Sequence, residues 1–123
     1  MADILMIEDD AAIRMLVKTY LEQAGHTVRE ADNGQVGISM AQADVPALII
    51  LDINMPVMDG TQTIKALQAE ASTKDIPVIA LSAVTVPEMR DDMHLLGCRG
   101  YVEKPIDFDI LMEHTNRLLG LKV

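Results

Sequence analysis

Four groups of polar residues in this chain each follow a short apolar run, and the acids among them could together hold a cation. Three acids occupy residues 8–10, Asp52 and Ser82 each end a further run, and Lys104 follows a fourth. Two or three carboxylates within about 4 Å repel by roughly 4 kcal/mol per pair at an effective dielectric constant of about 20. Such a cluster needs a cation, and oxygen ligands without imidazole or thiolate favour a hard ion such as Mg²⁺.

The lysine and the serine add the means to bind a phosphoryl group. Lys104 cannot ligate a metal, but its ammonium group can hold a phosphoryl oxygen as a point charge. The Ser82 hydroxyl can donate a hydrogen bond to another phosphoryl oxygen. Asp52 is then the candidate nucleophile of a phosphoryl-handling site.

These side chains can meet only if the apolar runs before them are neighbouring strands. Five apolar runs alternate strictly with five segments of helical periodicity, which predicts an α/β fold with a parallel sheet and helices on both faces. Right-handed crossovers and polar second and fifth strands favour the order 2-1-3-4-5, the flavodoxin-like arrangement. The predicted strands are residues 4–7, 27–31, 47–51, 78–81 and 100–102, and helices begin near residues 11, 35, 61, 87 and 108.

Local signals mark the ends and faces of the first two helices. Asp10 is placed to cap the N-terminus of the first helix, and Gly25 stands where a left-handed residue would end it. The second helix is expected to bury Val36, Met40 and Ala43.

Length and charge limit the class of protein. A chain of 123 residues predicts one domain, residues 1–123. Its 10 basic and 19 acidic residues give a net charge of -9, which argues against direct binding to nucleic acid or to an anionic membrane. One cysteine, Cys98, cannot form an internal disulfide, and no apolar run reaches membrane-spanning length. We therefore expect a cytoplasmic protein without membrane insertion.

Five motifs in chain order resemble the receiver domain of two-component response regulators. They are the acids at residues 8–10, Asp52, the sequence MPVMDG at residues 55–60, Ser82 with the small Ala83 after it, and Lys104-Pro105. The resemblance extends over the whole chain and implies a phosphorylation-controlled switch. A sensor histidine kinase or a histidine phosphotransfer protein would supply the phosphoryl group from a phosphohistidine, and a downstream target protein would read the result.

The resemblance also implies roles for individual residues. The residue at the position of Asp52 accepts the phosphoryl group in this family, and an acidic pair holds Mg²⁺. Ser82 replaces the threonine of many members but keeps the hydroxyl group. The implied set is Glu8, Asp9, Asp52 and the backbone carbonyl of Asn54 for the metal, Ser82 and Lys104 for the phosphoryl group, and Ser82 with Tyr101 for the switch.

The acidic triplet offers two possible pairs. If Asp10 caps the first helix, the pair is Glu8 and Asp9, with Asp9 as the direct ligand. Glu8 is longer than an aspartate and can act through a water molecule.

Two other classes of protein compete with the switch. A phosphatase or phosphotransferase of the haloacid dehalogenase type also uses a strand-end aspartate, but it needs a second acid where this chain has Asn54. A flavin-binding domain of the same fold is disfavoured because three acids replace its phosphate loop. We therefore expect no enzyme, but a phosphoacceptor that catalyses at most its own phosphorylation and slow dephosphorylation. The chain ends soon after Leu119, so output would pass through non-covalent partners unless the chain is an excised piece.

Overall fold

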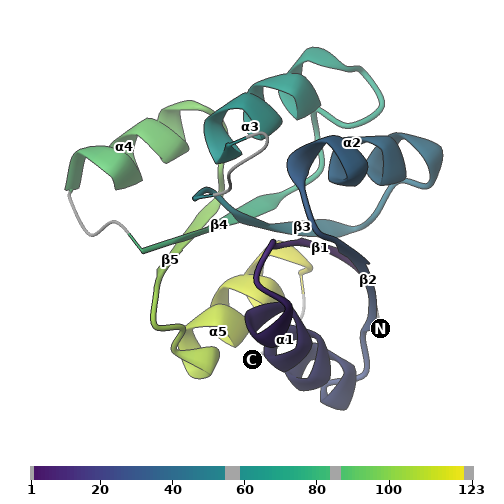
Figure 1. Ribbon diagram of the computed structural model, residues 1–123, viewed down its shortest axis with the longest axis vertical. Coiled ribbons are helices and arrows are strands. Elements are labelled where there is room, and N and C mark those ends of the chain that lie inside the picture. The colour runs from purple at the N-terminus through teal and green to yellow at the C-terminus, as the bar shows by residue number, and fades with distance from the viewer. Residues whose placement is uncertain (1, 55–58, 84–86, 121–123) are drawn as a thin grey trace.

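Five strands and five helices alternate along the residues that this computed structural model describes, namely 2–54, 59–83 and 87–120 (Figure 1). Most of the MPVMDG turn predicted at residues 55–60 thus lies outside the described residues. No helix within them has the length and apolar character needed to cross a bilayer. In chain order the elements are β1 (Asp3–Ile7), α1 (Ala11–Gln23), β2 (Thr27–Ala31), α2 (Gly34–Ala43), β3 (Leu48–Asp52), α3 (Gly60–Ala69), β4 (Val78–Ser82), α4 (Pro87–Leu95), β5 (Gly100–Glu103) and α5 (Phe108–Leu118).

The strands form one parallel sheet in the order β2-β1-β3-β4-β5, which confirms the predicted flavodoxin-like arrangement. β1 and β3 lie side by side where the order reverses, with Met6 opposite Ile50. Every residue of β3 is buried, as expected for a strand covered on both faces. The carboxyl ends of β1, β3, β4 and β5 consequently share one edge of the sheet.

Helices cover both faces of the sheet and build two apolar cores (Figure 1). On one face α1 and α5 pack over Leu48 and Ile50, and on the other α2, α3 and α4 pack over Ile49 and Leu51. This alternation follows from the two-residue period of a strand. The continuous run of apolar residues in β3 therefore supplies both cores.

The predicted ends of α1 are confirmed. The Asp10 carboxylate accepts hydrogen bonds from the backbone N–H groups of Ala12, at 2.9 Å, and Ile13, at 3.2 Å. Gly25 follows the helix with a φ of 96°, a left-handed conformation that glycine adopts without steric cost. The cap fixes the point at which the acidic loop turns into the helix.

The predicted inward face of α2 is wrong in part. Val36 is 42% exposed and Ala43 is also exposed, whereas Gly37 and Ala41 are buried and Met40 is half-buried. The helix lies too close to the sheet for larger side chains, because a Cβ atom on Gly37 would lie 2.4 Å from Cδ1 of Ile7. Apolar periodicity does not reveal this, since the closest contact is made by a glycine.

Two glycine substitutions test how tightly the helices sit on the sheet. A Cβ on Gly60 would lie 2.3 Å from the Ile53 Cα, so we expect Gly60→Ala to lower the free energy of unfolding by about 1–3 kcal/mol. Gly37→Ala should cost less, because its overlap is with side-chain atoms of Ile7 and alanine gains about 1 kcal/mol in helix propensity. Urea denaturation of both variants measures the difference. A larger loss for Gly37→Ala would contradict this ranking.

Candidate functional site

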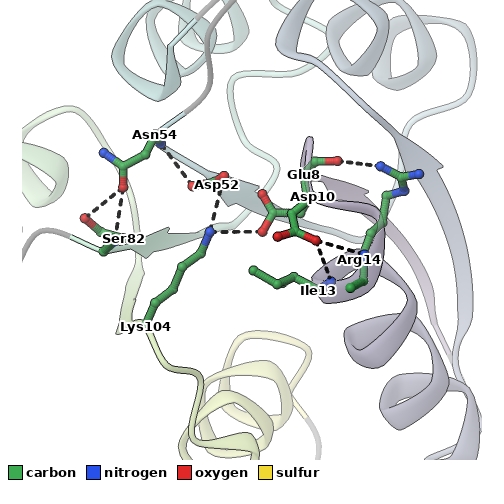
Figure 2. Close-up of polar contacts among 10 residues, drawn as sticks. Glu8, Asp10, Ile13, Arg14, Asp52, Asn54, Ser82 and Lys104 are labelled. Atoms are coloured by element: carbon green, nitrogen blue, oxygen red, sulfur yellow. Dashed lines mark hydrogen bonds and ion pairs between the residues drawn. The ribbon is translucent and has the colours of Figure 1, made fainter.

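The predicted strand-end residues converge at one edge of the sheet (Figure 2). Glu8 follows β1, Asp52 ends β3, Ser82 ends β4 and Lys104 follows β5. The parallel pairing of these four strands brings their carboxyl ends together although the residues are far apart in the chain. Glu8, Asp52 and Ser82 are almost completely buried.

The Lys104 side chain bridges the two buried carboxylates. Its Nζ lies 3.0 Å from Glu8 Oε1 and 3.3 Å from Asp52 Oδ2, and only 17% of the side chain is exposed. The backbone N–H of Lys104 donates to the Ser82 carbonyl at 2.8 Å, which extends the pairing of β5 with β4 to the site. The lysine is therefore held by its backbone and aimed at the acids by its side chain (Figure 2).

The surroundings separate the protonation states of the two carboxyl groups. Burial raises the pKa of Glu8 to about 8, and the adjacent Asp52 acts in the same direction while Lys104 opposes it. Burial also opposes ionisation of Asp52, but contacts with Glu8 and with the Asn54 amide outweigh it and lower the Asp52 pKa. The surroundings therefore favour the protonated form of Glu8 and the ionised form of Asp52.

The acidic residues fit a divalent cation. One carboxylate oxygen each from Glu8, Asp9 and Asp52 lies within 4.8 Å of the others. Glu8 Oε2 is buried and has no hydrogen-bond partner among the described residues. A buried oxygen left without a partner costs about 1–3 kcal/mol, which a metal bond would recover. Carboxylate oxygens of this kind match the requirements of Mg²⁺, which is bound by few protein ligands and keeps several of its waters.

The side chain of Asn54 joins the ends of β3 and β4, a role that was not predicted. Its backbone N–H donates to Asp52 Oδ1 at 3.0 Å. Its side-chain Oδ1 accepts from the Ala83 N–H at 3.1 Å and lies 3.5 Å from the Ser82 Oγ (Figure 2). The sequence feature that could have indicated this role is the amide side chain two residues after the candidate nucleophile. The prediction had used the Asn54 backbone carbonyl as a metal ligand and its side chain only as evidence against a second catalytic acid.

Tyr101 lies outside the acidic cluster. It is half-buried on β5, where the Arg90 guanidinium lies 5.5 Å from its ring centroid, and it packs against the core beneath α2, α3 and α4. A cavity of about 450 Å³ lies beside it, with His94, Cys98 and His114 in its lining. The tyrosine therefore belongs to the surface between α4 and α5.

A second residue that sequence reasoning missed is Arg14. Its Nη1 donates to the backbone carbonyl of Glu8 at 2.8 Å, and its Nε pairs with Glu30 Oε1 at 3.2 Å. A hydrogen bond from a helix side chain to a loop carbonyl leaves no periodic signal in the sequence. The contact places Arg14 next to the acidic loop.

Comparisons with known proteins agree with this arrangement. Residues 4–116 match the family described as the response regulator receiver domain. Protein PilH of Pseudomonas aeruginosa is 34% identical over 123 aligned positions, which cover 98% of this chain and 99% of PilH. The DNA-binding dual master transcriptional regulator RpaA of Synechocystis is 35% identical, but the match covers 97% of this chain and 49% of RpaA, so this chain spans about half of that regulator. The solved structure of chemotaxis response regulator CheY4 of Vibrio cholerae has a TM-score of 0.89 at 32% identity, covering 96% of this chain and 98% of that one.

The capping bonds of Asp10 generate a test of the metal site. Asp9→Ala should weaken Mg²⁺ binding by about tenfold or more, on the scale of changes to a metal's ligand environment. Asp10→Ala should retain Mg²⁺ affinity and lose about 1 kcal/mol of folding stability, because Asp10 is engaged as the helix cap. Calorimetric Mg²⁺ titration and urea denaturation separate the two effects. The reverse pattern would assign the metal to Asp10.

Proposed function

The chain belongs to the response regulator receiver domain family, and from this premise we propose that Asp52 accepts a phosphoryl group from a phosphohistidine. The observation that carries the proposal is the position of its carboxylate, which is buried, has a lowered pKa and lies 3.3 Å from Lys104 Nζ. We take residues 1–123 as one receiver domain. The haloacid dehalogenase alternative is not supported, since the receiver family match covers residues 4–116.

We assign the metal site to Glu8, Asp9, Asp52 and the backbone carbonyl of Asn54. Three of these residues supply the clustered carboxylate oxygens described above. A bound Mg²⁺ would neutralise negative charge on the transferred phosphoryl group. Glu8 Oε2 has no hydrogen-bond partner within the described residues, so it would gain most from contact with such a cation.

In the transfer step, an Asp52 carboxylate oxygen attacks phosphorus. The bond between phosphorus and the donor imidazole nitrogen breaks, and its electron pair stays on the imidazole. Lys104 is already beside Asp52, so its ammonium group can donate to an oxygen of the transferred phosphoryl group. The lysine thus serves as countercharge before and after transfer.

The phosphorylated state should persist rather than turn over. Asn54, two residues after Asp52, cannot act as a base near neutral pH. Its side-chain oxygen also accepts a bond from the Ala83 N–H, which holds it toward β4. Without a general base, water attack on phosphoaspartate is slow, as a signalling switch requires.

We infer that the signal leaves the site through β4 and β5. To bond the phosphoryl group, the Ser82 hydroxyl must move from its position near Asn54 Oδ1. That movement would open space for Tyr101 on the adjacent strand and alter the surface formed with α4 and α5. We propose that a downstream target protein binds this surface, with a sensor histidine kinase or a histidine phosphotransfer protein as the donor. The net charge of -9 supports a protein that binds neither nucleic acid nor an anionic membrane directly, and we propose that it acts in the cytoplasm without membrane insertion.

Labelling with a small phosphodonor tests the acceptor. Acetyl phosphate with Mg²⁺ should phosphorylate the wild type and not Asp52→Asn, because the amide is a poor nucleophile. Intact-protein mass spectrometry measures the added phosphoryl group. Asp59→Asn serves as a control, since Asp59 caps α3 through the Gln62 N–H. Equal labelling of wild type and Asp52→Asn would refute the assignment.

The relay is tested with beryllofluoride, a mimic of the bound phosphoryl group. With Mg²⁺ it should shift amide resonances near Asp52 and, in the wild type, those of α4 and Tyr101. Ser82→Ala should keep the shifts near Asp52 and weaken the distant ones by about half or more, because the hydroxyl can no longer supply differential binding to the two states. Undiminished distant shifts would mean that another route carries the signal.

A further inference from the structure

The Arg14 guanidinium connects the acidic loop to a strand outside the site. Nη1 donates to the Glu8 carbonyl at 2.8 Å, and Nε lies 3.2 Å from Glu30 Oε1 on β2 (Figure 2 shows the Glu8 contact). Only 20% of the Arg14 side chain is exposed. The planar fork of arginine allows both bonds at once, so the side chain has little freedom to rotate.

The Glu8 carbonyl is part of the peptide group that joins Glu8 to Asp9. A peptide group is planar, so fixing its oxygen also fixes the direction in which the chain enters Asp9. On the other side, the Asp10 carboxylate is bound to the first turn of α1, and the Asp10 carbonyl accepts from the Arg14 N–H at 2.9 Å. Asp9 is itself exposed but lies between two anchored neighbours.

Arg14 does not act as an uncompensated positive charge near the acids. Glu30 pairs with it and also with Lys18, whose Nζ lies 3.1 Å from Glu30 Oε2. Within the described part of the chain, Lys18 contacts Glu30 and not the acidic loop, and it lies one turn further along α1. The two cations therefore share a partner and differ in their contact with Glu8.

We propose that Arg14 is a positioning residue for the metal ligands, holding the Glu8–Asp9 peptide so that both carboxylates face Asp52. The proposal rests on the proposed function, because it assigns Mg²⁺ to this cluster. It gives a role to a side chain that touches neither the metal position nor the phosphoryl acceptor.

Mg²⁺ titration of two charge-matched variants tests the proposal. Arg14→Met and Lys18→Met each remove one positive charge from α1, which by electrostatics alone would leave Mg²⁺ binding unchanged or strengthen it. We expect Arg14→Met to bind Mg²⁺ about tenfold more weakly, the scale of losses when groups that orient metal ligands are removed. Lys18→Met should bind as tightly as the wild type or slightly more tightly. The sign of the change thus separates positioning from charge.

Two further readouts keep the proposal distinct from a loss of stability. In the metal-free protein, the Asp9 amide resonance should move in Arg14→Met and stay in place in Lys18→Met. At saturating Mg²⁺, Arg14→Met should reach wild-type labelling of Asp52 by acetyl phosphate, because Arg14 contacts no reacting atom. Should Arg14→Met fail to fold, Arg14→Lys replaces it, with an intermediate loss expected because one ammonium group cannot reproduce the two-armed contact.

The outcomes distinguish this proposal from the proposed function. Wild-type Mg²⁺ affinity in the folded Arg14 variant, together with normal Asp52 labelling, would overturn the positioning role and leave the switch intact. An equal loss in Lys18→Met would also overturn it. Absence of Mg²⁺ binding by the wild type would overturn both.

Discussion

The contacts of Lys104 with the two buried carboxyl groups are the ones on which the site depends. Glu8 and Lys104 are separated by 96 positions in the chain, so their contact forms only when the first and last strands have joined the same sheet. Buried carboxylates that face one another are costly without a countercharge, and removing one member of such a buried group typically costs about 3–5 kcal/mol. The lysine thus makes an otherwise unfavourable cluster compatible with a folded protein.

The cluster remains incompletely satisfied. One oxygen of Glu8 has no partner among the described residues, and burial raises the pKa of the group to about 8, which disfavours its charged form. Stability alone would favour apolar residues at these strand ends. A bound cation would account for three acids at this place. The metal would coordinate the Glu8 oxygen and favour the charged form of Glu8, which burial disfavours.

Local patterns predicted the framework of the site, and tertiary contacts account for what they missed. The order of the strands and the cap at Asp10 follow from hydrophobic periodicity and helix-end chemistry, which act over a few residues. The face of α2 was assigned incorrectly because the close approach of helix and sheet at Gly37 is a property of two elements together. The contacts of Arg14 with Glu8 and of Asn54 with Ala83 were missed for a similar reason. Each contact joins a side chain to the backbone of a different segment. The spacing of Arg14 and Asn54 in the sequence does not indicate these contacts.

Asn54 contributes to two properties of the site, and this constrains how the domain can evolve. Its amide side chain supplies no general base beside Asp52, and the oxygen of the same side chain accepts the Ala83 N–H at the end of β4. Under the proposed function, the first property bears on how long a signal lasts and the second on how strongly it is passed on. One substitution would alter duration and strength together, so selection acting on this residue cannot adjust either property alone. Independent adjustment of output strength must come from residues further along the route, such as those around Tyr101.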